Sequence, residues 1–235
     1  MNKANMPGAV CAKTLYTYID IGLIEGVTNE TLWEKRHRKK QRKKVLHRKP
    51  KSRPTRRKRI DERPIEAEDR ADFGHWEIDL VVGGKGAQKP VLLTLLERKT
   101  RVMIIRKLSD RTQASVLKAL NGIERSMGAE AFRVRFRSIT ADNGSEFLDV
   151  ESIEASVFSK GKRTQIYYAH PYSSWERGSN ENGNKMIRRF IPKGSCLSGY
   201  SRTEIRKTEE WINQYPRKIL GFKTAAEMFN LEMAA

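Results

Sequence analysis

The chain has 235 residues, 38% of them hydrophobic, which is enough for one good core with sequence left over for appended segments. Its formal net charge is +19, and the excess is concentrated in residues 35–59, which hold 16 lysines and arginines and no acidic residue. The rest of the chain, with 31 basic and 28 acidic residues, is almost balanced. A cationic segment beside a balanced domain favours a polyanionic partner, although a solvated linker that is basic without function is the alternative.

The same survey argues against three classes of protein. No apolar run reaches the ~20 residues that a membrane-spanning helix needs. The two cysteines, Cys11 and Cys196, are far apart and no secretory signal accompanies them, which fits a reducing cytoplasm without a disulfide framework. His37 and His47 lie inside the basic run with no close cysteine pair after them, so we expect no structural zinc. The expected protein is cytoplasmic and has no membrane partner.

The first predicted element is a short amphipathic helix. Apolar residues recur at Leu15, Ile19 and Leu23, and Gly26 is the predicted end of the helix. One such helix cannot bury its apolar face alone. We therefore interpret residues 1–30 as the last helix of a small helical domain whose earlier helices are missing.

A basic linker is predicted over residues 31–67. Pro50 and Pro54 prevent a long helix there, and the charge predicts a tether that becomes ordered only on a partner. The folded core is then expected over residues 68–235.

The core opens with a predicted antiparallel meander of three strands, Trp76–Val82, Val91–Glu97 and Val102–Leu108. The glycines at 83, 84 and 86 indicate a hairpin turn after the first strand. A helix capped by Ser109 or Asp110 follows and ends by Gly128. The later predicted elements are a strand at Phe136–Ala141, a helix near Asp149–Phe158, a strand at Thr164–Ala169, and helices from Glu176 or Ser179 to Phe190, at Arg202–Gln214, and at Ala225–Leu231 with Thr224 as cap.

This order of elements predicts an α/β fold. Antiparallel strands first and helix crossovers afterwards make a mixed five-stranded sheet with helices on its faces.

Three carboxylates occupy positions that need an explanation. Asp79 lies inside an apolar strand, where a buried carboxylate costs several kcal/mol unless a cation or hydrogen bonds compensate it. Asp142 is the last residue of the segment FRSITAD, at the end of a predicted strand. Asn143-Gly144 follows at once, so the Asp142 side chain should face a cleft. Glu181, on a later helix, would lie over the same place. Each acid alone could be structural, but the three together in this fold order favour a shared site.

Three such acids suit phosphodiester chemistry. In-line displacement uses one metal ion to activate the attacking oxygen and a second, about 3.5–4 Å away, to stabilise the leaving oxygen. Carboxylate oxygens suit Mg²⁺, with Mn²⁺ as a substitute. The expected metal ligands and catalytic residues are Asp79, Asp142 and Glu181.

Four blocks in this order resemble one known family. They are GHWEIDLVVG, TLLERKTR, TADNGSEF and HPYSSWERGSNENGNKMIRRFIPKG. They are similar to the catalytic core of bacterial transposases of the insertion sequence thirty family, relatives of retroviral integrases, over about residues 68–230. The last block alone is long and distinctive.

The resemblance implies an RNase H-like, integrase-like fold, an Asp-Asp-Glu site, and divalent metal. It implies cleavage at transposon ends and strand transfer into target DNA, by a homo-oligomer in a synaptic complex associated with the nucleoid. Residues 1–30 would then be the remnant of the family's helix-turn-helix DNA-binding region.

Two glutamates compete for the third acidic position. Glu176 lies 34 positions after Asp142, close to the family's usual spacing, and Glu181 lies 39 positions after it. We favour Glu181, because Asn184, Lys185 and Arg188 follow it on the same helical face, where they could hold the metal site and grip DNA phosphates. Glu176 is expected in the first helical turn, next to backbone N–H groups.

Other residues have weaker signals. Glu77 shares a strand face with Asp79 and could support the metal site from behind its ligands, but a place near the rim of the site is favoured. Glu146 could orient a water on the second metal or cap the following helix, and the cap is favoured. His170, Tyr172 and Trp175 could stack a splayed base or pack within their loop. Further DNA contacts are predicted in the basic run at Lys39, Lys40, Arg42, Lys43, Lys44, Arg56 and Arg57.

Three functions stay open at this point. The leading hypothesis is a transposase that cleaves and joins DNA. An RNase H-like nuclease would use the same metals without joining. A truncated, non-catalytic DNA-binding regulator of transposition would keep the basic segment and lack the chemistry.

Overall fold

A computed structural model describes residues 10–28, 57–84, 89–171, 173, 176 and 178–234. The chain divides into two units, Met1–Arg53 and Pro54–Ala235. In the first unit, helix α1 spans Ala12–Asp20, and its N-cap Cys11 accepts a hydrogen bond from the Thr14 amide. The helix ends before the predicted stop at Gly26, because Gly22 already has a φ of 75° that α-helical geometry does not allow.

The second unit is built on one five-stranded sheet with the order β3-β2-β1-β4-β5. The strands are β1 (His75–Val82), β2 (Val91–Glu97), β3 (Met103–Leu108), β4 (Ser138–Ala141) and β5 (Gln165–Tyr168). The first three pair antiparallel, and β1 with β4 and β4 with β5 pair parallel. The predicted α/β fold with a mixed five-stranded sheet is confirmed.

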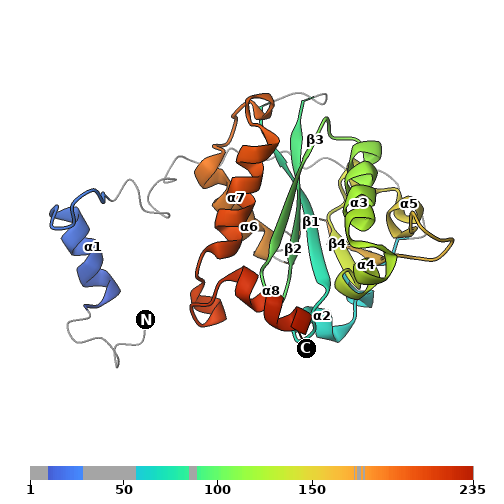
Figure 1. Ribbon diagram of the computed structural model, residues 1–235, viewed down its shortest axis with the longest axis horizontal. Helices are drawn as coiled ribbons and strands as arrows, with labels where there is room; N and C mark the ends of the chain where they lie inside the picture. The colour runs from blue at the N-terminus through green and yellow to red at the C-terminus, as the bar shows by residue number, and fades with distance from the viewer. Residues whose placement is uncertain are drawn as a thin grey trace. The chain divides into compact units, whose positions relative to one another are not determined.

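Helices cover both faces of this sheet (Figure 1). On one face lie α6 (Gly178–Phe190), against β1 and β2, and α7 (Arg202–Gln214), against β3. On the other face lie α3 (Gln113–Met127), α4 (Ala129–Arg135) and α5 (Val150–Glu154). The chain ends with α8 (Ala225–Ala234), which packs on α7. This layered arrangement leaves the strands buried on both sides, which explains their nearly continuous apolar sequences.

Helix α4 was not predicted from the sequence. Gly128 ends α3 with a φ of 84°, but the chain continues as a second short helix and not as a strand leading to Phe136. The rings of Phe132 and Phe136 stack with centroids 4.3 Å apart, and Phe136 stacks on Trp76 of β1 at 4.4 Å. All three side chains are buried. This aromatic contact with a strand that is distant in sequence favours the helix. The local sequence alone does not reveal such a contact.

Several element boundaries also differ from the predictions. Thr112, and not Ser109 or Asp110, caps α3 by accepting a hydrogen bond from the Ser115 amide. Helix α5 ends at Glu154, because Ala155 pairs with Lys162 and closes a loop there. The predicted cap of α8 is present, since the Thr224 hydroxyl accepts from the Glu227 amide at 3.1 Å.

The compact unit begins earlier than the predicted boundary at residue 68. Arg59 forms a parallel bridge with Tyr168 of β5, and short helices follow at η3 (Ile60–Glu62) and α2 (Ile65–Glu68). Ala67 is fully buried. Residues 57–67, assigned to the linker from their charge, are therefore part of the core. Buried polar contacts, described below, attach residues 57–67 to the core. Hydrophobic periodicity in the sequence does not reveal such contacts.

Within the part of the chain that the structure describes, no helix combines the length and apolar character needed to cross a bilayer.

Candidate active site

Two predicted acids belong to neighbouring parallel strands or their ends, Asp79 within β1 and Asp142 directly after β4. Strands β1 and β4 pair in the register Glu77 to Thr140. This pairing ends there, so Asp79 and Asp142 each lie two residues beyond the last paired residues. Asp79 projects from the face that α6 covers, since Asn184 of α6 contacts it. Both are partly buried.

The loop after β4 holds Asp142 in a defined position. The amide of Gly144 donates to Asp142 Oδ1 at 2.9 Å, and the Asn143 side chain donates to the Ala169 carbonyl at 2.7 Å. A Cβ at position 144 would lie 2.8 Å from Asp142 Oδ1 and 2.9 Å from Glu146 Oε1. The two carboxylates therefore close around a space that only glycine leaves open.

Glu146 does not cap the following helix, as the sequence had suggested. Its carboxylate is buried and pairs with Arg111 at 2.8 Å. Helix α5 is capped by Asp149, which accepts from the Ser152 amide at 3.2 Å. The prediction was wrong because Arg111, 35 residues earlier in the sequence, supplies a stronger partner than a helix terminus does.

Helix α6 brings the predicted C-terminal cluster to β1. Asn184 Nδ2 donates to Asp79 Oδ2 at 2.7 Å. Glu181 lies three residues earlier, one turn along the same face. Its side chain is 69% exposed and pairs with Lys185 at 3.4 Å. The structure thus brings Asn184 into contact with an acid, while Glu181 and Lys185 lie at the exposed edge of the helix.

Arg188 anchors the end of α6. Its guanidinium donates to the Val82 carbonyl at 2.6 Å and, with longer contacts, to the carbonyls of Ile191 and Pro192. Burial lowers its pKa. These contacts hold the C-terminal end of α6 against the end of β1, and a contact of Arg188 with DNA stays a prediction.

Glu176 lies before α6 and has other partners. It accepts from the backbone amide of His170 at 2.9 Å and from the imidazole Nδ1 at 2.8 Å. The other ring nitrogen of His170 lies 3.0 Å from Asp61. The hydrogen bond to Glu176, and then the charge of Asp61, raise the pKa of His170. Glu176 therefore binds the preceding loop and not the first turn of the helix. The other two residues expected near His170, Tyr172 and Trp175, lie outside the described residues.

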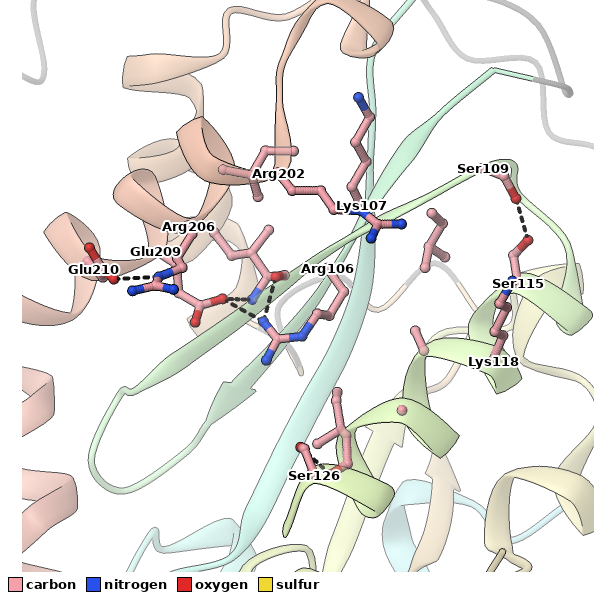
Figure 2. A pocket seen from close by; sticks show the side chains of 16 residues that line it. Arg106, Lys107, Ser109, Ser115, Lys118, Ser126, Arg202, Arg206, Glu209 and Glu210 are labelled. Atoms are coloured by element: carbon pink, nitrogen blue, oxygen red, sulfur yellow. Dashed lines mark hydrogen bonds and ion pairs between the residues drawn. The ribbon is translucent and has the colours of Figure 1, made fainter.

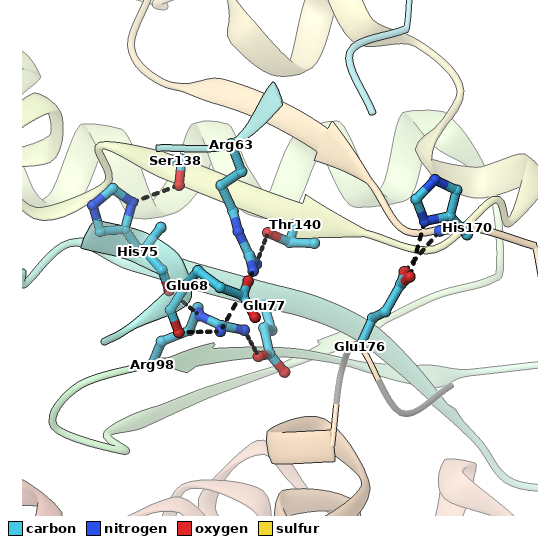
Figure 3. A network of polar contacts seen from close by, with 10 residues as sticks. Arg63, Glu68, His75, Glu77, Arg98, Ser138, Thr140, His170 and Glu176 are labelled. Atoms are coloured by element: carbon cyan, nitrogen blue, oxygen red, sulfur yellow. Dashed lines mark hydrogen bonds and ion pairs between the residues drawn. The ribbon is translucent and has the colours of Figure 1, made fainter. Parts of the chain in front are cut away.

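Glu77 is completely buried and does not lie at the rim of the site; its polar contacts are drawn in Figure 3. It forms an ion pair with Arg98, whose side chain is 3% exposed, and accepts from the Asn180 amide at 3.1 Å. Arg63, from the segment before the sheet, joins this network through Glu68 and through the Thr140 hydroxyl at 3.1 Å. The expectation for Glu77 was wrong, although the signal used for Asp79, an acid inside an apolar strand, applied to it equally.

Most of the predicted basic contacts lie outside the described residues, namely Lys39, Lys40, Arg42, Lys43, Lys44 and Arg56. Arg57 is described, and its guanidinium lies 5.3 Å from the ring centre of Tyr168. The stack places the end of the basic run beside β5.

A separate groove of about 630 Å³ lies between α3 and α7 over β3 (Figure 2). Figure 2 shows Arg106 and Arg206 paired with Glu209 and Glu210 along it. None of the predicted catalytic or DNA-binding residues lines this groove.

Among the described residues, no three histidine, cysteine, aspartate or glutamate side chains are grouped closely enough to hold a metal ion. Asp79 lies within β1, and Asp142 directly follows the neighbouring strand β4. A five-stranded mixed sheet with helices on both faces is the architecture of an RNase H-like core.

Comparison with known proteins identifies the relatives of this chain. It is 38% identical over 224 residues to a probable transposase for the insertion-like sequence element IS1161 of Streptococcus salivarius, covering 95% of this chain and 59% of that protein. It is 39% identical over 170 residues to the transposase for IS4351 of Bacteroides fragilis, and 36% identical over 175 residues to the transposase for IS30C of Escherichia coli K12. These two matches cover 72% and 74% of this chain. No protein-family model matches.

The chain therefore belongs to the family of insertion-sequence transposases that includes IS30. It spans 59% of the length of the Streptococcus salivarius relative, 48% of the Bacteroides fragilis one and 43% of the Escherichia coli one.

Proposed function

We propose that this chain carries the catalytic core of a DNA transposase, which cleaves a phosphodiester at transposon ends and transfers the freed strand into target DNA. The observation that carries the proposal is the hydrogen bond from Asn184 of helix α6 to Asp79 of β1, the strand that pairs in parallel with β4, which Asp142 directly follows. The relatives named as transposases support the same conclusion.

The chemistry of the donor set suits a hard divalent cation, and Glu181, which pairs with Lys185 and is not grouped with the two aspartates, would have to turn toward them to complete the site. Asp79, Asp142 and Glu181 would hold Mg²⁺, with Mn²⁺ as a substitute, because carboxylate oxygens are the ligands these ions prefer. A bound ion would supply activation of the attacking oxygen and stabilisation of the leaving oxygen. Glu181 is preferred to Glu176, because it lies one turn from Asn184, which contacts Asp79, whereas both oxygens of Glu176 accept hydrogen bonds from His170.

The chain's own residues have distinct tasks in this proposal. Asn184 fixes one oxygen of Asp79 by a hydrogen bond and so orients the carboxylate. Lys185 is half exposed, with 53% of its side chain accessible, and would exchange Glu181 for a DNA phosphate when that acid turns to the metal. The basic run would hold DNA through phosphate contacts without reading its sequence. A homo-oligomer would bring the two transposon ends together on the nucleoid.

A strand-transfer assay tests the proposal. The chain is incubated with Mg²⁺ and duplexes carrying the ends of its own element, both uncut and pre-cut, and a plasmid target. Joined product that disappears with EDTA is the expected result. Cleavage without joining would indicate a nuclease, and DNA retention without either product would indicate a non-catalytic regulator. Either of these two results would contradict the proposal.

A further inference from the structure

The buried pair of Glu77 and Arg98 lies directly beside the proposed active site. Glu77 is 0% exposed, and its two carboxylate oxygens have different partners. One accepts from Arg98, and the other accepts from the backbone N–H of Asn180 at 3.1 Å. Burying two charges is costly, and such a pair persists only where geometry and further hydrogen bonds compensate it. The partners of the two Glu77 oxygens therefore indicate the structural role of the pair.

The hydrogen bond from the Asn180 N–H to Glu77 caps the N-terminus of helix α6. Asn180 is the third residue of this helix, so its N–H has no partner within the helix. A carboxylate at a helix N-terminus satisfies such a donor and interacts favourably with the helix dipole. Here the acid comes from strand β1, far away in sequence. The Asn180 carboxamide is buried and has no hydrogen-bond partner among the described residues, so the bond to Glu77 through the backbone N–H is the polar contact that the structure shows for Asn180 at this end of the helix.

A second contact follows one helical turn later. Glu77 contacts Asn180, and Asp79 contacts Asn184. Two strand residues advance about 6.6 Å and four helical residues advance about 6.0 Å, so the two contacts match along β1 and α6. Together they determine both the position of α6 along β1 and its rotation. Glu181 lies between them in the helix, and its position relative to Asp79 is fixed by the same two bonds.

Arg98 connects this pair to the segment before the sheet. Its Nε donates to the Ala67 carbonyl at 2.8 Å, and a second nitrogen donates to the Glu68 carbonyl at 3.4 Å. Figure 3 shows Arg98 between Glu77 and Glu68. The guanidinium thus holds Glu77 in one rotamer while its other donors are bonded to α2.

We propose that Glu77, held by Arg98, is a positioning residue that sets α6 so that Glu181 faces Asp79. This inference rests on the proposed function for its catalytic consequence. The positioning itself is a structural statement that amide exchange measures independently.

The test compares two double variants that differ in one group. Glu77→Leu/Arg98→Met removes both buried charges together with the acceptor for the Asn180 N–H. Glu77→Gln/Arg98→Met removes the same charges and keeps an acceptor oxygen. Every contact that Arg98 makes is lost equally in both, so the difference between them reports the side chain at position 77, where only glutamine offers an acceptor to the Asn180 N–H.

Amide hydrogen exchange of the full chain gives the first readout. We expect the Asn180 amide of the parent chain to exchange as slowly as the interior of α6, despite its place in the first turn. We expect at least tenfold faster exchange in Glu77→Leu/Arg98→Met than in Glu77→Gln/Arg98→Met. An Asn180 amide that is unprotected in the parent, or equal exchange in the two variants, would overturn the positioning. The parent measurement needs no variant to fold.

Strand joining with pre-cut ends gives the second readout, over a range of Mg²⁺ concentrations. The leucine variant should join at least tenfold less than the glutamine variant and need more Mg²⁺ for half-maximal rate, while both retain DNA. Fast exchange with parental joining and parental Mg²⁺ dependence would reduce Glu77 to a structural role and overturn the proposal. A parent that joins no DNA would instead contradict the proposed function, and the exchange result would still decide the positioning.

Discussion

A methyl group at position 144 should disable the proposed site with a small effect on the fold. In Gly144→Ala the new Cβ would lie 2.8 Å from Asp142 Oδ1 and 2.8 Å from Glu146 Cδ. Ordinary contacts begin near 3.4 Å, so one carboxylate or both must move by about half an ångström or more. Overpacking of this kind costs about 1–3 kcal/mol of stability.

The effect on chemistry should exceed the effect on stability. Displacement of a reacting group by about 1 Å can lower a rate about a hundredfold, and Asp142 moves directly when position 144 is filled. We expect at least a tenfold loss of strand joining, with a fall in unfolding free energy of no more than about 3 kcal/mol.

Gly122→Ala is the matched control. Gly122 lies in α3 with nothing within 4 Å of the position that a Cβ would take. Alanine there should stabilise the protein by about 0.5–1 kcal/mol and leave joining unchanged. Strand joining and urea unfolding are measured on the same preparations. Parental joining by a folded Gly144→Ala variant would refute the assignment of Asp142 to the site.

Three further predictions follow from other parts of the structure. Arg163→Met should lower the free energy of unfolding by about 3–5 kcal/mol in urea titrations, because Arg163 and Glu124 form a fully buried pair; a loss below about 1 kcal/mol would contradict this. His170→Gln should lower the melting temperature more at pH 6 than at pH 8.5. The raised pKa of His170 contributes stability that is complete below about pH 6.5 and is lost as the pH rises through the folded-state value, so equal shifts at both values would argue against the contact with Glu176 and Asp61. Deleting residues 35–56, which spares the core segment from Arg57, should flatten the salt dependence of DNA binding, since each neutralised phosphate contributes about 0.9 to the slope; an unchanged slope would show that the run does not contact DNA.

The strands and their order along the chain could be predicted because their causes are local. Alternating or continuous apolar runs marked all five strands, and Thr224 was correctly predicted as the cap of the last helix. Helical spacing from Glu181 also predicted Asn184 at the site, and the structure places its carboxamide on Asp79.

The rest depends on partners that are distant in sequence. Glu77 meets Arg98 and Asn180, Glu146 meets Arg111, and Phe136 meets Trp76 only after the chain has folded. An acid inside a strand indicates that a partner exists, but the pattern does not say which residue it is. For this reason two carboxylates that had been given peripheral roles are among the most buried polar groups of the core.

The central claim is that Asp79, Asp142 and Glu181 together carry the chemistry. Its most direct test is Mg²⁺-dependent joining of pre-cut ends by Asp79→Asn, Asp142→Asn and Glu181→Gln, with Glu176→Gln as the matched control and DNA retention measured in parallel. We predict that the first three variants retain DNA and form no joined product, and that Glu176→Gln joins at a rate near that of the parent. Joining by Glu181→Gln together with its loss in Glu176→Gln would contradict the assignment of the third acid, and joining by either aspartate variant would contradict the site itself.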